Sequence, residues 1–282
     1  MVAKGQLPSA FGSENKPAPI NRALVFAFNF FAPWVLFILA FSTMSFYLHY
    51  SAPALAFILV GVMLLVPLGC GVAGVKAQAA ETGMRWLPLS VGTLVINIAV
   101  GSYTGAENFM RNMQPFYDVD SLNAYDAVDP HARGQAYMDA GRVRFSPEAA
   151  VHAEFSIGFK NLNVYCVAPI MGANQTYADF WAVGVNCCDG GKFECGEMSA
   201  LAHSGLRVMR DDETPFYRLG VQQAMAEHGL RSTHPVFFYW LVDPRAEALD
   251  MSAEGSRWYL VAILFSLLFN LFYGGLASNI AK

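Results

Sequence analysis

Four of the five cysteines, which carry the most reactive side chains of this 282-residue chain, lie close together in the sequence. Thiols at such spacing can form disulfides or bind a metal ion. The alternative to disulfides is a zinc site of Cys187, Cys188, Cys195 and His203. Adjacent cysteines on an extended chain point to opposite faces, and no CxxC pair is present, so the spacing disfavours zinc. An even number of cysteines predicts two disulfides among Cys166, Cys187, Cys188 and Cys195.

Two apolar runs, at residues 164–168 and 180–185, predict a β-hairpin around a turn near Asn174. Because side chains alternate along a strand, joining the apolar face of each strand favours the pairs Cys166–Cys187 and Cys188–Cys195. The swapped pairing remains open. A cross-link over roughly 20 residues contributes about 3 kcal/mol by chain-entropy reasoning.

Other residue types were considered for chemistry. His152, His203 and His234 are the first candidates for an acid or base, but no nucleophile elbow or phosphate-binding glycine loop is present. A set of acidic residues could bind calcium through carboxylate oxygens, but it lacks the EF-hand pattern and its glycine. The set comprises Asp118, Asp120, Asp126 and Asp129. We therefore predict no catalytic residue, no metal and no cofactor. Asn174 begins an Asn-Gln-Thr sequon, which predicts a glycosylation site.

Further elements are expected around the cysteines. Strands are predicted at residues 205–209 and 236–242, with another at 142–145. Between the first two lies a helix with Thr214 as its N-cap, Pro215 in its first turn and Gly229 just past its end. One face of this helix is apolar. The combination predicts a mixed α+β domain stabilised by disulfides.

The composition places this domain on a membrane protein. Hydrophobic residues make up 55 % of the chain and charged residues only 14 %. Four stretches approach the roughly 20 apolar residues that a bilayer-spanning helix needs; they are residues 23–48, 53–75, 86–105 and 257–278. The sequence thus predicts an α-helical bundle of four transmembrane helices, with residues 106–256 forming the α+β domain. A net charge of -4 without a basic run disfavours nucleic-acid binding, so no nucleic-acid partner is expected.

Charge predicts the orientation. The tail at residues 1–22 and the loop between the second and third helices are net basic, which places both in the cytosol by the positive-inside rule. Residues 279–282 follow a fourth crossing and are expected there too. The segment 106–256 is then lumenal or extracellular, and it carries 20 acidic and 11 basic residues. The sequon and the cysteines lie in the same segment.

Within the predicted spans, Asn97 is the strongly polar side chain that we single out, and no charged residue lies inside their end residues. A single amide in a span more often bonds to a neighbouring helix than lines a path, so a pore or transporter ranks third among the functions. Gly101 and Gly105 form a GxxxG spacing that favours close helix packing, within the bundle or between copies of the chain.

Several motifs of the outer segment are shared with a known group of proteins. They are LNAYDAVDP (122–130), MDAGR (138–142), GFKN (158–161), VYCVAPI (164–170), FWAVG (180–184), CC (187–188), FEC (193–195) and PFYR (215–218). Through them the chain resembles the uncharacterised, multi-copy transmembrane protein family of dinoflagellates. This resemblance implies the domain limits and the cysteine set, but no reaction, ligand or partner. A tetraspanin is a less fitting alternative because the first outer loop is too short and Cys166 is additional.

These observations favour a non-enzymatic, multi-pass membrane protein that displays an acidic, disulfide-linked outer domain for adhesion, scaffolding or ligand recognition. Its expected partners are the lipid bilayer and either other membrane proteins or further copies of itself. The alternative is a membrane-bound enzyme of the secretory pathway with its site in the outer domain.

Overall fold

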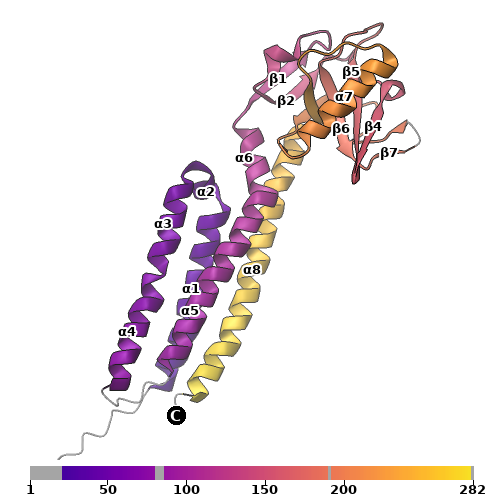
Figure 1. Ribbon diagram of the computed structural model, residues 1–282. Coiled ribbons are helices and arrows are strands. Elements are labelled where there is room, and N and C mark those ends of the chain that lie inside the picture. Colours follow the sequence, from indigo (N-terminus) through magenta and orange to yellow (C-terminus); the bar gives the residue numbers. More distant parts are fainter. Residues whose placement is uncertain (1–20, 80–85, 190–191, 281–282) are drawn as a thin grey trace, which may run out of the picture. The chain divides into compact units, whose positions relative to one another are not determined.

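The computed structural model describes residues 21–79, 86–189 and 192–280 (Figure 1). It divides into two compact units. The first, which we call the helical unit, comprises the described residues within 1–43, 54–103 and 261–282. The second, the sheet unit, draws on Met44–Pro53 and Thr104–Leu260.

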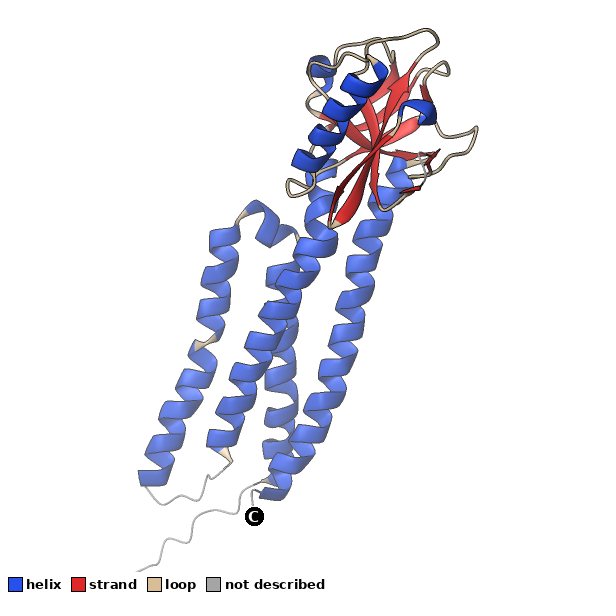
Figure 2. Cartoon of the chain, turned by 45° about the vertical axis from the view of Figure 1, so that its right-hand side comes forward, coloured by secondary structure: helices blue, strands red, loops and turns tan. Residues whose placement is uncertain are grey.

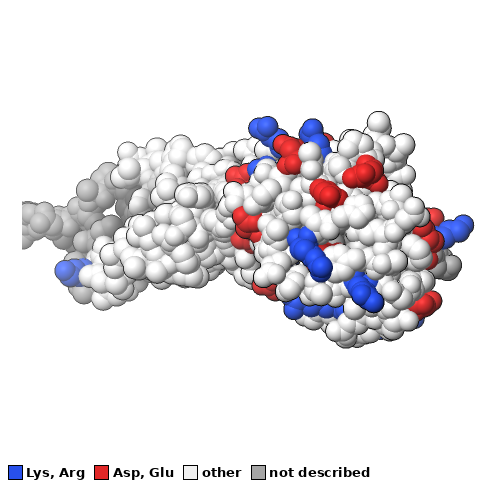
Figure 3. All heavy atoms as spheres, turned by 90° about the horizontal axis from the view of Figure 1, so that it is seen from above, with Lys and Arg blue, Asp and Glu red and all other residues white. Residues whose placement is uncertain are grey.

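Four helical segments are long and apolar enough to cross a membrane, which confirms the predicted number of apolar helices. They run over Arg22–Ser45 (α1), Pro53–Gln78 (α3, Pro53–Met63, and α4, Leu65–Ala79), Leu87–Asp120 and Pro244–Ile280 (α8). The third comprises α5 (Leu87–Asn108), a π-helical turn η1 (Phe109–Met113) and α6 (Gln114–Asp120). A short helix α2 (Tyr47–Ser51) follows α1. Figure 3 shows charged side chains gathered on the sheet unit and mostly uncharged residues on the helical unit.

The fourth helix begins well before the predicted residue 257. Asp243 accepts hydrogen bonds from the backbone N–H groups of Arg245 (2.9 Å) and Ala246 (3.1 Å), and Pro244 occupies the first helical position. This is a regular N-cap. A hydropathy criterion missed it because the first turns of α8 are charged. The strands of the sheet unit accordingly lie within residues 123–241, inside the predicted limits of 106–256.

The sheet unit contains a mixed eight-stranded sheet of order β1-β2-β9-β10-β6-β5-β3, with β4 also paired to β5. Its strands are β1 (Asn123–Val128), β2 (Ala140–Phe145), β3 (Ala150–Val151), β4 (Ile157–Asn161), β5 (Asn163–Met171), β6 (Phe180–Val185), β9 (Ser204–Arg207) and β10 (Val236–Leu241). The predicted hairpin is confirmed as the antiparallel pair β5–β6, and β10 is central, parallel to β6 and antiparallel to β9. A small hairpin, β7 (Cys188–Asp189) with β8 (Lys192–Phe193), lies apart.

One face of this sheet is covered by helices. The predicted helix is α7 (Thr214–His228), which ends at Gly229 in the left-handed conformation (φ 67°). Its N-cap is Glu213, so the predicted cap Thr214 is already the first helical residue. Its Tyr217 and Val221 pack with Trp181 and Val183 of β6. Figure 2 shows a helix lying against the sheet. Towards β9, α6 and α8 cover the same face: Val119 and Ala248 pack on Leu206.

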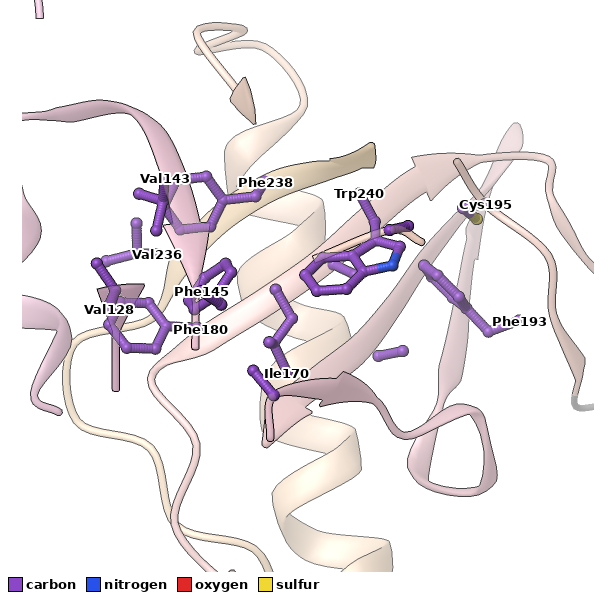
Figure 4. Close-up of a cluster of buried hydrophobic side chains, with 14 of the residues drawn as sticks. Val128, Val143, Phe145, Ile170, Phe180, Phe193, Cys195, Val236, Phe238 and Trp240 are labelled. Carbon is purple, nitrogen blue, oxygen red and sulfur yellow. The ribbon is translucent and has the colours of Figure 1, made fainter. Parts of the chain in front are cut away.

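The opposite face carries the larger core. Phe145, Phe180, Phe238 and Trp240 meet edge-on or tilted, with ring centroids between 5.3 and 6.3 Å apart (Figure 4). Ala132, in a loop, and Tyr137, at the end of the short 3-10 helix η2 (Gly134–Tyr137), pack against this core. Both faces of β5 and β6 are therefore apolar and buried.

Candidate functional site

The four outer cysteines form two disulfides, Cys166–Cys188 and Cys187–Cys195, with Cα–Cα separations of 5.8 and 5.0 Å. The favoured pairing of Cys166 with Cys187 is therefore wrong, and the swapped pairing is the one observed. In register, Cys166 lies opposite Gly184, whose face of β6 also carries Phe180 and Ala182. Past β6, the left-handed backbone of Asn186 (φ 57°) interrupts the alternation, and the Sγ atoms of Cys187 and Cys188 both lie beside this row of residues. The sequence could not distinguish the two pairings, because strict alternation does not continue from β6 to the two cysteines.

Two glycines make room for these disulfides. Gly158, Cys166 and Gly184 are cross-strand neighbours in one row over β4, β5 and β6. A Cβ atom at Gly184 would clash with Sγ of Cys187 and lie 2.8 Å from Cβ and Sγ of Cys195. A Cβ atom at Gly158 would lie 2.9 Å from Sγ of Cys188. Sulfur thus fills the space that side chains would occupy on either side of Cys166.

The candidate histidines have separate partners. Nδ1 of His203 lies 3.2 Å from the carbonyl oxygen of Ala149, and Nδ1 of His152 lies 2.8 Å from a carboxylate oxygen of Glu154. His234 donates its backbone N–H to Asp179. No contact among the described residues joins two of these histidines to a common carboxylate. The zinc alternative loses its thiol ligands to the disulfides.

The acidic set considered for calcium is also divided. Asp120 pairs with Arg142 and Asp126 with Arg144. Asp129 accepts hydrogen bonds from the backbone N–H and Nδ1 of His131, the first of which lowers its pKa most. Asn174 is exposed at a left-handed turn position (φ 59°) between β5 and β6.

Asp179 is a buried carboxylate that the sequence analysis missed. It accepts hydrogen bonds from the backbone N–H groups of Gly134 (2.9 Å) and Thr233 (2.8 Å), and from the hydroxyl groups of Ser232 and Tyr177. Burial by itself raises the pKa of Asp179, but the hydrogen bonds from Tyr177 and the backbone outweigh it and lower the pKa. The available signal for a buried carboxylate was the position of this single acid between the apolar residues Ala178 and Phe180. Its role is to tie three loop segments together.

A cleft of about 620 Å³ opens where the helices leave the sheet uncovered. Its floor is formed by β1 and β2, whose residues Ala124 and Arg142 are paired in register. Arg142 is in turn opposite Leu206, so its side chain lies on the face that α6 and α8 cover further along. Phe116 of α6 and Leu249 of α8 contribute apolar walls. Its volume is in the range of small-molecule sites.

Opposite charges line this cleft in equal number. The lining includes Arg142, Arg144 and Arg245 together with Asp120, Asp126 and Asp243. The Arg142–Asp120 and Arg144–Asp126 pairs are separated by 3.6 and 3.7 Å, longer than a hydrogen bond. Asp243 is engaged as the cap of α8, and Arg245 has no ion pair among the residues that the structure describes. The spacing of these residues along the chain gave no signal for the cleft.

Polar side chains are also buried in the helical unit. Asn97 and Asn270 exchange two amide hydrogen bonds, at 2.9 and 3.2 Å, and the hydroxyl of Ser266 donates to the same oxygen of Asn97. Near the start of α1, the side chain of Asn29 accepts a hydrogen bond of 2.6 Å from the hydroxyl of Ser90 on α5. Singling out Asn97 was incomplete, because Asn29 and Asn270 also lie in apolar helices.

The two glycines singled out for packing lie on α5. A Cβ atom at Gly101 would lie 2.8 Å from the carbonyl oxygen of Phe37, so α5 and α1 approach closely there. Gly105 is buried one turn later.

In comparisons with known proteins, no family model, no curated protein and no solved structure matches the chain.

Proposed function

We propose that this chain is a multi-pass membrane protein whose α+β domain faces away from the cytosol and recognises a small charged ligand in the cleft beside α6 and α8. The domain acts by binding and not by catalysis. The observation that carries the proposal is the cleft itself, a concave site with three guanidinium and three carboxylate groups.

Membrane insertion is supported by what the helical unit exposes. Phe57, Ile58 and Leu68 leave 60 to 63 % of their surface uncovered, which lipid would cover at a gain of about 25 cal/mol per Å². The polar side chains point the other way: Asn29, Asn97 and Asn270 are all buried and paired with one another or with serine. Polar groups inside and apolar groups outside are the arrangement that a bilayer requires.

The orientation is supported by charge and by sulfur. Seven basic and two acidic residues lie outside 106–256, against 11 and 20 within it. Short basic segments remain in the cytosol, and disulfides persist in oxidising compartments on the other side. Asn174 is exposed on the same domain, where a glycan could be attached without displacing the core.

Ligand recognition is supported by where the cleft lies in the chain. Asp120 ends the segment Leu87–Asp120, and Arg245 lies in the first turn of α8, so two of its walls belong to segments that continue as apolar helices. A ligand held there touches both chain segments that lead into the domain. This favours a receptor or sensor over a passive scaffold.

The test is ligand-induced thermal stabilisation of the full chain in nanodiscs, with a panel of small carboxylates, phosphates, amines and amino acids as probes. We expect at least one probe to raise Tm in proportion to its concentration. Ala124→Trp fills the exposed floor of the cleft and should abolish that shift. Leu162→Trp, at a 99 % exposed hairpin tip, is the matched control and should retain it. A panel without any hit, or a shift that survives Ala124→Trp, would overturn the proposal.

A further inference from the structure

The charges of the cleft restrict the class of ligand, provided that the cleft is the binding site proposed above. The formal charges of its three guanidinium and three carboxylate groups sum to zero. A purely anionic ligand would meet three carboxylates as well as its partners, and a purely cationic ligand would meet three guanidinium groups. Groups of like charge within one cleft repel the ligand and disfavour its binding. A ligand that carries both signs avoids this cost.

The existing ion pairs leave capacity for such a ligand. Arg142–Asp120 and Arg144–Asp126 are separated by 3.6 and 3.7 Å and are partly solvated. Exposed pairs of this kind contribute little to stability, about 0–1 kcal/mol. A guanidinium has five N–H donors and a carboxylate about four acceptor sites, so each group can bind a ligand without leaving its neighbour. Both members of each pair are available together.

Arg245 adds a third cationic group beside the first turn of α8. Since Asp243 already caps that helix, and Arg245 has no ion pair among the described residues, its guanidinium is the one best placed to take a carboxylate in bidentate fashion. Asp120 and Asp126 then remain for a cationic group. Phe116 and Leu249 offer apolar surface to the rest of the ligand.

We propose that the cleft binds a small zwitterion that carries a carboxylate and an ammonium group close together, as an α-amino acid does. The carboxylate is held by the guanidinium groups, the ammonium group by the Asp120 and Asp126 carboxylates, and the side chain lies against the apolar walls.

The experiment is isothermal titration of the full chain in nanodiscs with the standard L-amino acids. Each amino acid that binds is compared with two relatives, the acid that lacks its amino group and the amine that lacks its carboxylate. We expect at least one amino acid to bind about tenfold or more tightly than either relative, a difference of about 1.4 kcal/mol or more. Arg245→Gln should weaken the binding of that amino acid more than the binding of the amine. Asp126→Asn should weaken the binding of the amino acid more than the binding of the acid. Lys160→Gln and Glu148→Gln are controls outside the cleft lining, and they should leave the affinity for the amino acid and for both relatives unchanged.

The possible failures are distinguishable. If a simple acid or phosphate binds in the cleft as tightly as any amino acid, the zwitterion assignment is wrong while ligand recognition by the cleft stands. If no amino acid and no other charged probe binds, both proposals are wrong. If an amino acid binds but Arg245→Gln and Asp126→Asn leave its affinity unchanged, the site is elsewhere and the assignment is again overturned.

Discussion

Asn97 of α5 and Asn270 of α8 each donate an amide hydrogen bond to the other, and both side chains are buried among apolar helices. A reciprocal amide pair satisfies both groups at once, so neither is left unpaired among apolar side chains. Together with Asn29 and Ser90 it links α1, α5 and α8 through side chains. The span formed by α3 and α4 is the least buried of the four, with 11 % of its most apolar stretch buried. No such amide pair reaches it among the hydrogen bonds described.

Replacing one partner of this pair should cost more than replacing both. Asn97→Leu leaves the side-chain oxygen of Asn270 without its donor, while the NH2 group of Asn270 still donates to Ser266; we expect the substitution to lower helix-bundle stability by about 1–2 kcal/mol. In the double variant Asn97→Leu/Asn270→Leu we expect part of that loss to be recovered, because no unpaired amide remains. Thermal or denaturant unfolding in mixed micelles gives the double-mutant cycle. Strictly additive effects of the two substitutions would contradict the pairing.

A methyl group at Gly184 should prevent the disulfides from forming as they do. Its Cβ would clash with Cys187 and lie 2.8 Å from Cys195. We expect Gly184→Ala to cost about 2–4 kcal/mol, comparable with the loss of a disulfide, and to increase the free-thiol count. Mass spectrometry under non-reducing conditions measures this count. Gly275→Ala is the control, since nothing lies within 4 Å of its added Cβ; equal behaviour of the two variants would contradict this packing.

The stability of the sheet unit should fall in acid because of Asp179. Hydrogen bonds hold its folded pKa below the ordinary value, so its contribution is fully present above the unfolded pKa of about 3.9 and is lost as the pH falls through the folded pKa. Asp179→Asn should be less stable at pH 7 and should lose less stability between about pH 4 and pH 2 than the native chain. Urea unfolding at a series of pH values measures both. Parallel pH profiles for the two proteins would rule out this role of Asp179.

Asp243 should matter for the start of α8. Its side chain caps the N–H groups of Arg245 and Ala246, so Asp243→Ala should cost about 1 kcal/mol, while Asp243→Asn or Asp243→Ser should retain most of the stability. Hydrogen exchange of the first turn of α8 reports the effect locally. Asp250→Ala, an exposed acid further along the same helix, serves as the control and should be neutral.

The four helices and the β5–β6 hairpin were predictable because each is encoded by a local pattern, an apolar run or an alternation bounded by turn residues. The pattern around Asp243 and Pro244 was also local, and it was missed because only hydropathy was used to find the fourth helix. The strands β1, β3 and β4 are short or polar, and their pairing comes from partners distant in sequence.

The cysteine pairing and the cleft were beyond local patterns. Alternation along β6 does not decide whether Cys187 or Cys188 pairs with Cys166, because the left-handed backbone of Asn186 interrupts it before either cysteine. The cleft brings together residues from α6, β1, β2 and α8, and Asp120 and Arg245 meet there only once the sheet has formed. Hydrogen bonds to Asp179 likewise come from segments on either side of it in the sequence.

The most direct test of the account is the side of the membrane on which the sheet unit lies, measured by endoglycosidase treatment of the full chain expressed in eukaryotic cells. The account predicts a glycan on the native chain that disappears in Asn174→Gln, and none on Phe11→Asn/Asn174→Gln, in which a new sequon ends at Ser13. A glycan on that double variant, with none on the native chain, would place the sheet unit in the cytosol and contradict the account.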